Sequence, residues 1–382
     1  MGERTILLQT KSSATRFKKM TNAFISVKWT MILMLLPVML SLYKCMQKTV
    51  LDLCELDSCP LCYGTNMCSE IQAGNVTLQY NTLKSAFYNI FSVKNVYFAK
   101  CGGKNCILKK LVHRHEFLEI GSHGDTEMEL VKYLMSVSDI KKFKICNQHT
   151  AEEFLKQLKY DDIRHIDILL QLNVEPLLLQ IFNKENDWPI PKFYGSCGRL
   201  AIMEYAGKDL NTIEHADWFK RAYVAHKILE AAINFTLNHP VFRLYLTDIS
   251  PDNIVVDDQL RISFVDLEHG ILNSKLQGKK NLHASDHYLD ENYAFSESEI
   301  CHSDISDHNI YSVCKLLLSQ FALWPMMNKG LLHDPPEHVK KEYSNLFIDI
   351  EDCLHSKEGK DRFLIADHIL DNLSLLLKNN VF

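Results

Sequence analysis

The sequence lacks several features that would mark it as a member of a broad protein class. Its formal net charge of −5 over 382 residues is small, which implies neither a basic surface for nucleic acid nor a strongly acidic tail. No repeat or low-complexity segment appears, so repeat architectures are excluded. No uncharged apolar run reaches the roughly 20 residues that span a bilayer comfortably. The length and the ordinary apolar and charged content indicate a two-lobed globular domain with appendages.

An apolar segment without charge lies near the N-terminus, at residues 29–43. Lys18, Lys19 and Lys28 precede it, which predicts a cytosolic tail at residues 1–28 and a lumenal remainder. Two interpretations stay open, a type II signal anchor and a signal peptide with a long n-region. We favour the anchor because no small-x-small cleavage site follows. Both predict a secretory-pathway protein, either held at a membrane of the Golgi or endoplasmic reticulum by this segment or secreted.

Cysteine is abundant, with 12 residues, and four of them cluster at positions 54–68, within the predicted cysteine-rich lumenal segment at residues 44–88. Behind a membrane-targeting segment this cluster predicts disulfide bonds, although the pairing cannot be deduced. A zinc site would need a second Cys-x2-Cys or His-x3-His pair nearby, and none follows. A thioredoxin-like redox pair would need a strand and a helix around Cys-x-x-Cys, where Pro and Gly stand instead. Cys101 and Cys106 bracket a Gly-Gly turn, as in a disulfide-bridged hairpin. The clustered disulfide candidates are Cys54, Cys59, Cys62 and Cys68, and the glycosylation sequons are at Asn75, Asn234 and Asn372.

Apolar periodicity predicts a strand-rich half followed by a helical half. The predicted fold is therefore α+β and bilobal, with a small N-lobe at 89–207, a helical insertion at about 139–187, and a larger helical C-lobe at 208–382. The stretch between 266 and 306 is predicted to be a loop. Helices are expected at 81–91, 126–138, 150–183, 217–237, 310–321 and 365–377, and strands at 95–100, 106–111, 199–205, 253–256 and 261–265.

Residues 246–253, LTDISPDN, match the Asp and Asn of the protein-kinase catalytic loop H-R-D-x-x-x-x-N. In that pattern Asp248 would orient the acceptor hydroxyl and accept its proton, and Asn253 would hold a metal ion. A predicted apolar hairpin then ends at Asp266, the position of the metal-binding Asp of D-F-G. An arbitrary loop would explain Asp248 and Asn253, but not the hairpin and the second Asp. The block predicts a kinase-like metal and nucleotide site.

Lys109 occupies the place of the V-A-I-K lysine, on a strand after a predicted hairpin turn. There it would reach the α- and β-phosphates of a nucleotide. A glutamate on the following helix should pair with it. Glu127 and Glu129 are both available, and we prefer Glu127.

Residues 200–207 resemble the strand and hinge that hold adenine in a protein kinase. Met203 would guard the adenine pocket, and the backbone of Glu204 and Ala206 would bond the adenine edge. The predicted cofactor is therefore ATP with Mg²⁺ or Mn²⁺.

Several parts of a working kinase are missing. No G-x-G-x-x-G precedes Lys109, and no A-P-E is visible. Thr247 stands in place of the catalytic-loop Arg, and Ser250 stands in place of a Lys that would stabilise transferred charge. Glu268 replaces the Gly of D-F-G, where its carboxylate would either add a metal ligand or repel phosphate.

Together these motifs resemble the divergent protein kinase domain family, and within it the branch of "deleted in autism protein 1". The resemblance extends from about Cys59 to the C-terminus. It implies a Golgi or secreted protein with a kinase-like fold, linked to secretion-pathway and growth or survival signalling. The segments that carry it are CPLCYGTNMC, VKNVYFA, ILKKL, WPIPKFYGSCGR, LYLTDISPDNIVV, FVDLEHGIL, DHNIYSVCKLLL and GLLHDPPE.

Three functions follow as hypotheses. The first is an active secretory-pathway kinase that phosphorylates a lumenal or extracellular protein or glycan. The second is a pseudokinase that binds a nucleotide, a receptor or another partner and signals without phosphoryl transfer. The third is a cysteine-rich structural or redox module with an incidental kinase-like fold.

Overall fold

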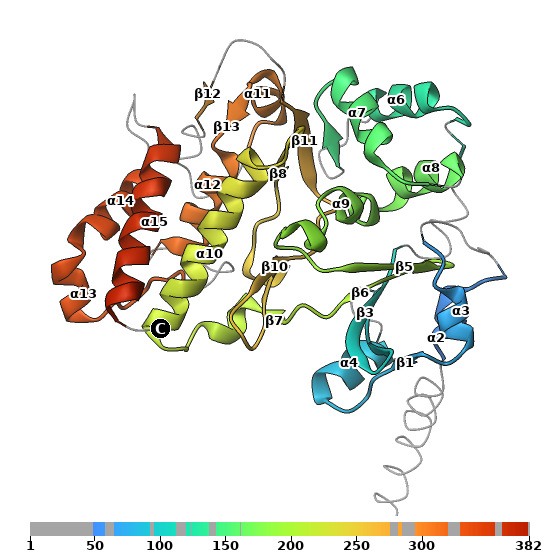
Figure 1. The fold of residues 1–382 in the computed structure, drawn as a ribbon, viewed down its shortest axis with the longest axis horizontal. Coiled ribbons are helices and arrows are strands. Elements are labelled where there is room, and N and C mark those ends of the chain that lie inside the picture. Colours follow the sequence, from blue (N-terminus) through green and yellow to red (C-terminus); the bar gives the residue numbers. More distant parts are fainter. Residues whose placement is uncertain are drawn as a thin grey trace, which may run out of the picture.

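Two lobes are joined by a short connection at residues 205–207 (Figure 1). The predicted apolar segment at 29–43 lies outside the residues that the structure describes. Within the described ranges, no helix is both long and apolar enough to cross a membrane. The computed structural model describes residues 49–57, 65–91, 95–111, 120–122, 124–136, 143–160, 162–275, 282–284, 295–319, 329–355 and 361–380.

A five-stranded antiparallel sheet forms the small lobe, in the order β1-β2-β3-β6-β5. Side chains alternate along β3, so that Cys106 and Leu108 are buried in the small-lobe core. Ile107 and Lys109 turn to the opposite face, where both line a cavity between the lobes. The elements are β1 (Val76–Leu78), α4 (Leu83–Phe91), β2 (Val96–Cys101), β3 (Lys104–Lys110), β5 (Phe193–Cys197) and β6 (Leu200–Glu204).

Two short helices before the sheet, α2 (Val50–Cys54) and α3 (Cys68–Gln72), belong to the same small-lobe core. A disulfide between Cys68 and Cys197 joins α3 to β5. The small lobe therefore begins before the predicted boundary at residue 89, because β1 and both helices pack with its sheet.

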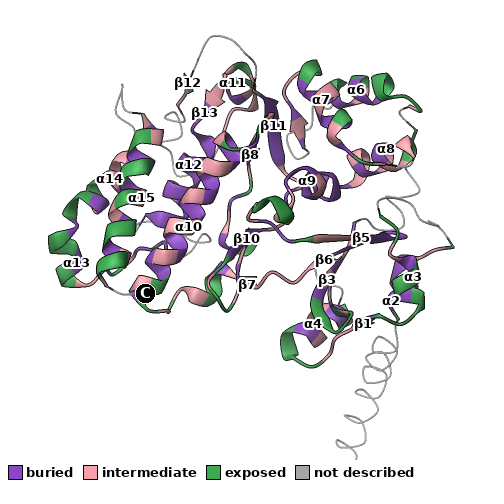
Figure 2. Cartoon of the chain, viewed as in Figure 1, coloured by how far each residue is buried: buried purple, intermediate pink, exposed green. Residues whose placement is uncertain are grey.

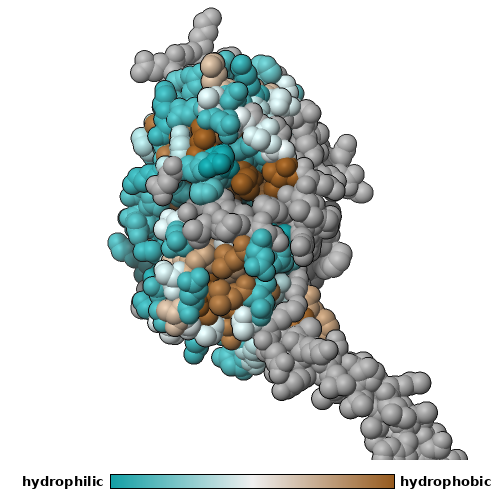
Figure 3. All heavy atoms as spheres, turned by 90° about the vertical axis from the view of Figure 1, so that its right-hand side faces the viewer, coloured by the Kyte–Doolittle hydropathy of each residue, from teal (hydrophilic) through white to brown (hydrophobic). Residues whose placement is uncertain are grey.

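Figure 3 shows the side of the molecule that bears α3 and α8, where apolar patches lie among hydrophilic residues.

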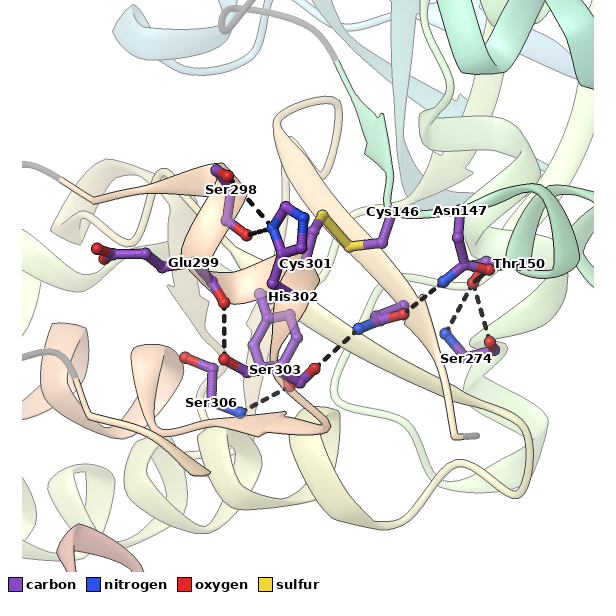
Figure 4. The surroundings of a disulfide bond; sticks show 12 residues. Cys146, Asn147, Thr150, Ser274, Ser298, Glu299, Cys301, His302, Ser303 and Ser306 are labelled. Atoms are coloured by element: carbon purple, nitrogen blue, oxygen red, sulfur yellow. Dashed lines mark hydrogen bonds between the residues drawn. A yellow bond between two sulfur atoms is a disulfide. The ribbon is translucent and has the colours of Figure 1, made fainter. Parts of the chain in front are cut away.

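A group of helices is inserted between β3 and β5 and lies above the sheet in Figure 1. Its short strand β4 runs parallel to β11 of the large lobe. The disulfide between Cys146 and Cys301 and a hydrogen bond from Asn147 to Asn273 reinforce this contact (Figure 4). The insertion is thus attached to both lobes. Its elements are α6 (Glu127–Ser136), β4 (Lys144–Ile145), α7 (Gln148–Gln157), α8 (Ile163–Leu172), α9 (Glu175–Ile181) and η2 (Lys184–Asn186).

Helix α10 (Trp218–Leu237) is the centre of the large lobe and packs against α12 and α15. Asp217 caps its first turn by accepting a hydrogen bond from the Phe219 amide. Figure 2 shows that the faces turned toward the interior of this lobe are buried. The remaining elements are β7 (Lys208–Asp209), η3 (Leu210–Ile213), β8 (Phe242–Leu246), η4 (Pro251–Asn253), β9 (Ile254–Val256), β10 (Ile262–Phe264), β11 (Gly270–Ser274), β12 (Leu282–His283), α11 (Glu297–His302), β13 (Ile305–Ser306), α12 (His308–Val313), η5 (Cys314–Leu318), α13 (Glu337–Glu342), α14 (Ser344–Leu354) and α15 (Arg362–Asn379).

The predicted α+β architecture of two lobes is confirmed, with a strand-rich small lobe and a helical large lobe. The prediction of a loop between residues 266 and 306 is wrong. Strand β11 lies there and pairs with β8, which was also not predicted. All five side chains of β11 are buried, so its residues, GILNS, show no alternation between apolar and polar positions.

Candidate active site

A cavity of about 330 Å³ lies between the lobes and brings together most of the predicted site residues. Apolar side chains line it from both lobes, including Val96 and Ile107 of the small lobe and Val255 of the large lobe. Polar side chains lie among them. The lining residues predicted from sequence are Lys109, Met203, Glu204, Ala206, Asn253 and Asp266.

Lys109 forms an ion pair with Glu175, the first residue of α9, with its Nζ 3.0 Å from Glu175 Oε2. Glu175 is fully buried, and its other carboxylate oxygen accepts a hydrogen bond from the Asp266 amide at 2.8 Å. The prediction that Glu127 pairs with Lys109 is wrong. Glu127 lies on α6 and accepts a hydrogen bond from the Tyr160 hydroxyl at 2.6 Å. Helix α9, which lies later in the insertion than α6, supplies the partner instead.

The sequence did contain a signal for Glu175. It is the single charged residue between positions 168 and 183, in an otherwise apolar and uncharged stretch. A carboxylate inside such a helix is buried with it, and a buried charge needs a charged or hydrogen-bonding partner.

Three carboxylates surround the Lys109 ammonium. Asp266 contacts it in addition to Glu175, and Glu268 Oε2 lies 3.3 Å from Nζ. Burial alone would lower the pKa of Lys109, but the three carboxylates raise it above its ordinary value. Burial raises the pKa of Glu268, although Lys109 opposes that shift. The side-chain amide of Asn173 also donates a hydrogen bond to Glu268, so this carboxylate is held beside Lys109.

The catalytic-loop residues Asp248 and Asn253 are joined by a hydrogen bond from Asn253 Nδ2 to Asp248 Oδ2 at 2.8 Å. Asn309, at the start of α12, fixes the strand that leads into this loop. Its Oδ1 accepts from the Leu246 amide at 2.8 Å, and its Nδ2 donates to the Leu244 carbonyl, also at 2.8 Å. Asn309 is fully buried, and the site prediction did not include it.

Asp266 adopts a left-handed backbone conformation, with φ of 62°. This conformation is uncommon for a residue other than glycine and persists only where the surroundings enforce it. Here the Glu175 carboxylate accepts the Asp266 N–H, and Lys109 contacts the Asp266 carboxylate. The backbone and the side chain of Asp266 are therefore both held at the cavity.

The donor set fits a hard divalent cation. Carboxylate and amide oxygens are the ligands that Mg²⁺ and Mn²⁺ take in proteins. Asn253 uses its amide nitrogen to bond Asp248, which leaves its oxygen as the atom suited to a metal. Asp266 lines the cavity and is one-third exposed. In the described part of the chain no three His, Cys, Asp or Glu side chains form a metal-binding group, so phosphate oxygens would have to complete the coordination.

The predicted hinge residues lie along one edge of the cavity. Met203, at the inner end, is buried and lines the cavity. The Glu204 side chain forms an ion pair with Lys184 at 2.6 Å. Gly207 has φ of 137°, and a Cβ there would lie 2.3 Å from the Val256 carbonyl oxygen. The connection between the lobes is therefore packed tightly against β9. The contacts of the Glu204 and Ala206 backbone with adenine stay a prediction.

The described cysteines bear out the disulfide prediction in part. Cys68 is disulfide-bonded to Cys197, and the predicted bridge across the β2–β3 hairpin is confirmed. The assignment of Cys54 is wrong, because its thiol is free and buried, and burial raises its pKa to about 12. Cys59 and Cys62 lie outside the described residues. The disulfides described are Cys68–Cys197, Cys101–Cys106, Cys146–Cys301 and Cys314–Cys353.

The three sequons differ in accessibility. Asn75 is exposed in the turn before β1. Asn234 and Asn372 are half-buried on α10 and α15, and Thr236 of the second sequon is fully buried. Glycosylation stays a prediction at all three, with the most open surroundings at Asn75.

The structure is that of a protein-kinase-like protein. It has two lobes with a cavity between them, and this cavity brings together Lys109, Glu175, Asn253 and Asp266. Comparison with known proteins agrees. Residues 168–355 match a family model described as the protein-kinase domain of FAM69. The chain is 27% identical over 381 residues to human divergent protein kinase domain 2A, covering 85% of this chain and 88% of the relative.

The Xenopus tropicalis protein of the same name is also 27% identical, over 380 residues and the same shares of both chains. Human divergent protein kinase domain 2B is 32% identical over 80 residues, which cover 21% of this chain and 18% of that protein. These similarities support the resemblance to divergent protein kinases that the motifs predicted.

Proposed function

We propose that this protein is a phosphotransferase that uses ATP and a divalent cation to phosphorylate a hydroxyl group on a lumenal or secreted substrate, most simply a protein. One observation carries the proposal. The ion pair between Lys109 and Glu175 is formed in the folded chain, although the inserted helices separate its partners in sequence. A formed pair of this kind is a requirement for an active kinase site.

The other polar groups support distinct steps. Asp248 is exposed and accepts from Asn253, so it is placed to orient a hydroxyl and to accept its proton. Asn253 and Asp266 would hold Mg²⁺ or Mn²⁺, which would neutralise charge on the phosphates. Lys109 would orient the nucleotide phosphates, and the apolar walls around Met203 would hold the base and exclude water.

We place this activity in the secretory pathway. Disulfides that join distant parts of the chain, such as Cys68–Cys197 and Cys146–Cys301, are typical of an oxidising compartment. The charge asymmetry around residues 29–43 and the sequons support the same location. Attachment to a Golgi or endoplasmic reticulum membrane through residues 29–43, or secretion after cleavage, is part of this proposal.

The alternative function is a pseudokinase that binds a nucleotide or a partner without phosphoryl transfer. One observation favours it. Lys109 is already surrounded by three carboxylates, so little of its charge is left for a phosphate. Thr247 and Ser250, which replace Arg and Lys of the usual catalytic loop, remove further cations.

Binding and turnover measurements on the purified full-length chain distinguish these two functions. ATP binding would be measured by calorimetry with and without Mn²⁺, and phosphoryl transfer by autophosphorylation and ATP hydrolysis. Asp266→Ala and Asp248→Asn serve as test variants, and Asp258→Asn, a loop residue outside the cavity lining, as the matched control. We expect turnover that depends on metal and is lost in both test variants.

Binding without turnover in the parent chain would establish the pseudokinase. Absence of any ATP binding would overturn the phosphotransferase and leave either a pseudokinase that binds only a partner or the third function, a structural or redox module. For the third function, a reducing agent that breaks the disulfides should abolish biological activity, and the Asp266→Ala substitution should leave that activity unchanged.

A further inference from the structure

The connection between β1 and β2 contains a helix where a protein kinase has a glycine-rich loop over the phosphates. Helix α4 lies between β1 and β2 in the chain and packs on β2. Asn89, which is buried, fixes the helix by donating to the carbonyls of Gln79 at 2.6 Å and Phe98 at 2.8 Å. Asn89 also accepts from the Phe98 amide at 2.7 Å. These bonds hold α4 in place against the edge of the small-lobe sheet.

One side of α4 faces the interlobe cavity. Lys84 and Tyr88 are four residues apart, so they share a helix face, and both line the cavity. The Tyr88 ring contacts Phe98 of β2, with centroids 5.4 Å apart. Lys84 Nζ lies 2.8 Å from Asp209 Oδ2 of β7, which is also a cavity residue. Helix α4 therefore reaches from the small lobe to the far side of the connection between the lobes.

Two lysines line the interlobe cavity, Lys84 and Lys109, and the charges around them differ greatly. Lys109 is nearly buried and contacts three carboxylates. Among the described residues, Lys84 forms an ion pair only with Asp209, and its side chain is 49% exposed. A half-exposed ion pair of this kind contributes little to stability, so Lys84 can exchange its partner at little cost. A hydrogen bond from an ammonium to a phosphate oxygen is charge-assisted and stronger than a neutral one.

We propose that Lys84 binds the phosphates of a nucleotide in this cavity and replaces the backbone amides of the missing glycine-rich loop. In the free protein Lys84 is held by Asp209 over the cavity. On binding, Lys84 exchanges Asp209 for a phosphate oxygen, and Asp209 becomes free to accept hydrogen bonds from the ribose hydroxyls. Lys84 is then a specificity-determining residue that favours phosphorylated nucleosides over unphosphorylated ones. The inference rests on the proposed nucleotide-binding function.

The test compares two ligands that differ only in phosphate. Dissociation constants for ATP with Mn²⁺ and for adenosine would be measured by calorimetry on the full-length chain and on Lys84→Ala and Lys84→Arg. The matched control is Lys192→Ala, because Lys192 also forms an exposed ion pair on the small lobe, with Glu185 at 2.7 Å, and does not line the cavity. We expect Lys84→Ala to weaken ATP binding about tenfold and adenosine binding less than about twofold. Lys84→Arg should retain ATP binding, and Lys192→Ala should change neither constant.

Two results would overturn the inference while leaving the proposed function intact. One is unchanged ATP binding in Lys84→Ala. The other is an equal loss of both ligands, which would show that Lys84 only holds the shape of the cavity. A parent chain that binds neither ligand would instead refute the proposed function, and this inference with it. Equal melting temperatures of parent and Lys84→Ala confirm that a change in binding is not a loss of folding.

Discussion

The Lys109 ammonium lies 3.0 Å from a carboxylate oxygen of Glu175, a residue 66 positions later in the chain. The first described helix after Lys109, α6, does not provide the partner. Helix α9, near the end of a long insertion, does, so the pair depends on how the insertion packs. The pair therefore reports that the site is assembled.

We predict that Glu175→Ala loosens the site and destabilises the fold. The substitution removes the Lys109 partner and the acceptor of the Asp266 amide. We expect a loss of roughly 1–3 kcal/mol in the free energy of unfolding, because buried donors lose their acceptor. ATP binding should also weaken. Denaturant unfolding and calorimetry would measure the two effects. Glu127→Ala is the control and should change stability by less than about 0.5 kcal/mol, since Glu127 is exposed. Equal effects of the two substitutions would contradict the assignment.

Gly207, in the connection between the lobes, should not tolerate a side chain. Its φ is 137°, and a Cβ would lie 2.3 Å from the Val256 carbonyl oxygen. We expect Gly207→Ala to reduce the unfolding free energy by about 1–3 kcal/mol, because the strained backbone or strand β9 must shift. Gly121→Ala is a matched control, since no atom lies within 4 Å of a Cβ there. If both variants melted at the parent temperature, the close packing of this connection would be disproved.

The disulfides should contribute to stability according to the length of chain that they close. Cys68 and Cys197 are 129 positions apart, whereas Cys101 and Cys106 are 5 apart. The chain-entropy model gives roughly 4–5 kcal/mol for the long closure and about 2 kcal/mol for the short one. Replacing each pair by alanine and measuring denaturant unfolding tests this order. Peptide mapping without reduction would check the pairing, and a Cys54–Cys68 bridge would contradict it.

His239 should make the fold sensitive to mildly acidic pH. Its Nδ1 accepts hydrogen bonds from the Val241 and Phe242 amides, and burial lowers its pKa to about 4. The unfolded chain, with an ordinary histidine pKa near 6.5, binds the proton more readily. The neutral imidazole therefore contributes stability above pH 6.5 that is lost as pH falls toward 4, by up to about 3 kcal/mol.

His239→Asn keeps an acceptor but does not titrate. Melting temperatures of both proteins between pH 7.5 and 4.5 would show the difference. We expect the parent chain to lose more stability than the variant between pH 6.5 and 4.5. Parallel curves would exclude His239 as the cause.

Local sequence patterns determined much of this protein before any tertiary structure was considered. The alternation and spacing of apolar residues placed the β2–β3 hairpin, the β9–β10 hairpin and helix α10. These elements depend mainly on neighbouring residues, such as the Asp217 cap of α10. The positions of Lys109, Asp248, Asn253 and Asp266 followed because they stand in or beside those elements at the spacings of protein-kinase motifs.

Tertiary structure alone decided which distant groups meet. Lys109 pairs with Glu175 rather than with Glu127. Cys68 forms a disulfide with Cys197, while Cys54 stays free. Strand β11 pairs with β8. Each of these contacts joins segments far apart in the chain and depends on how the insertion and the two small-lobe helices pack. Local propensity carries no information about such packing, because many partners of the same chemical type are available. A lysine in a strand predicts a carboxylate partner, but only the folded chain selects the carboxylate.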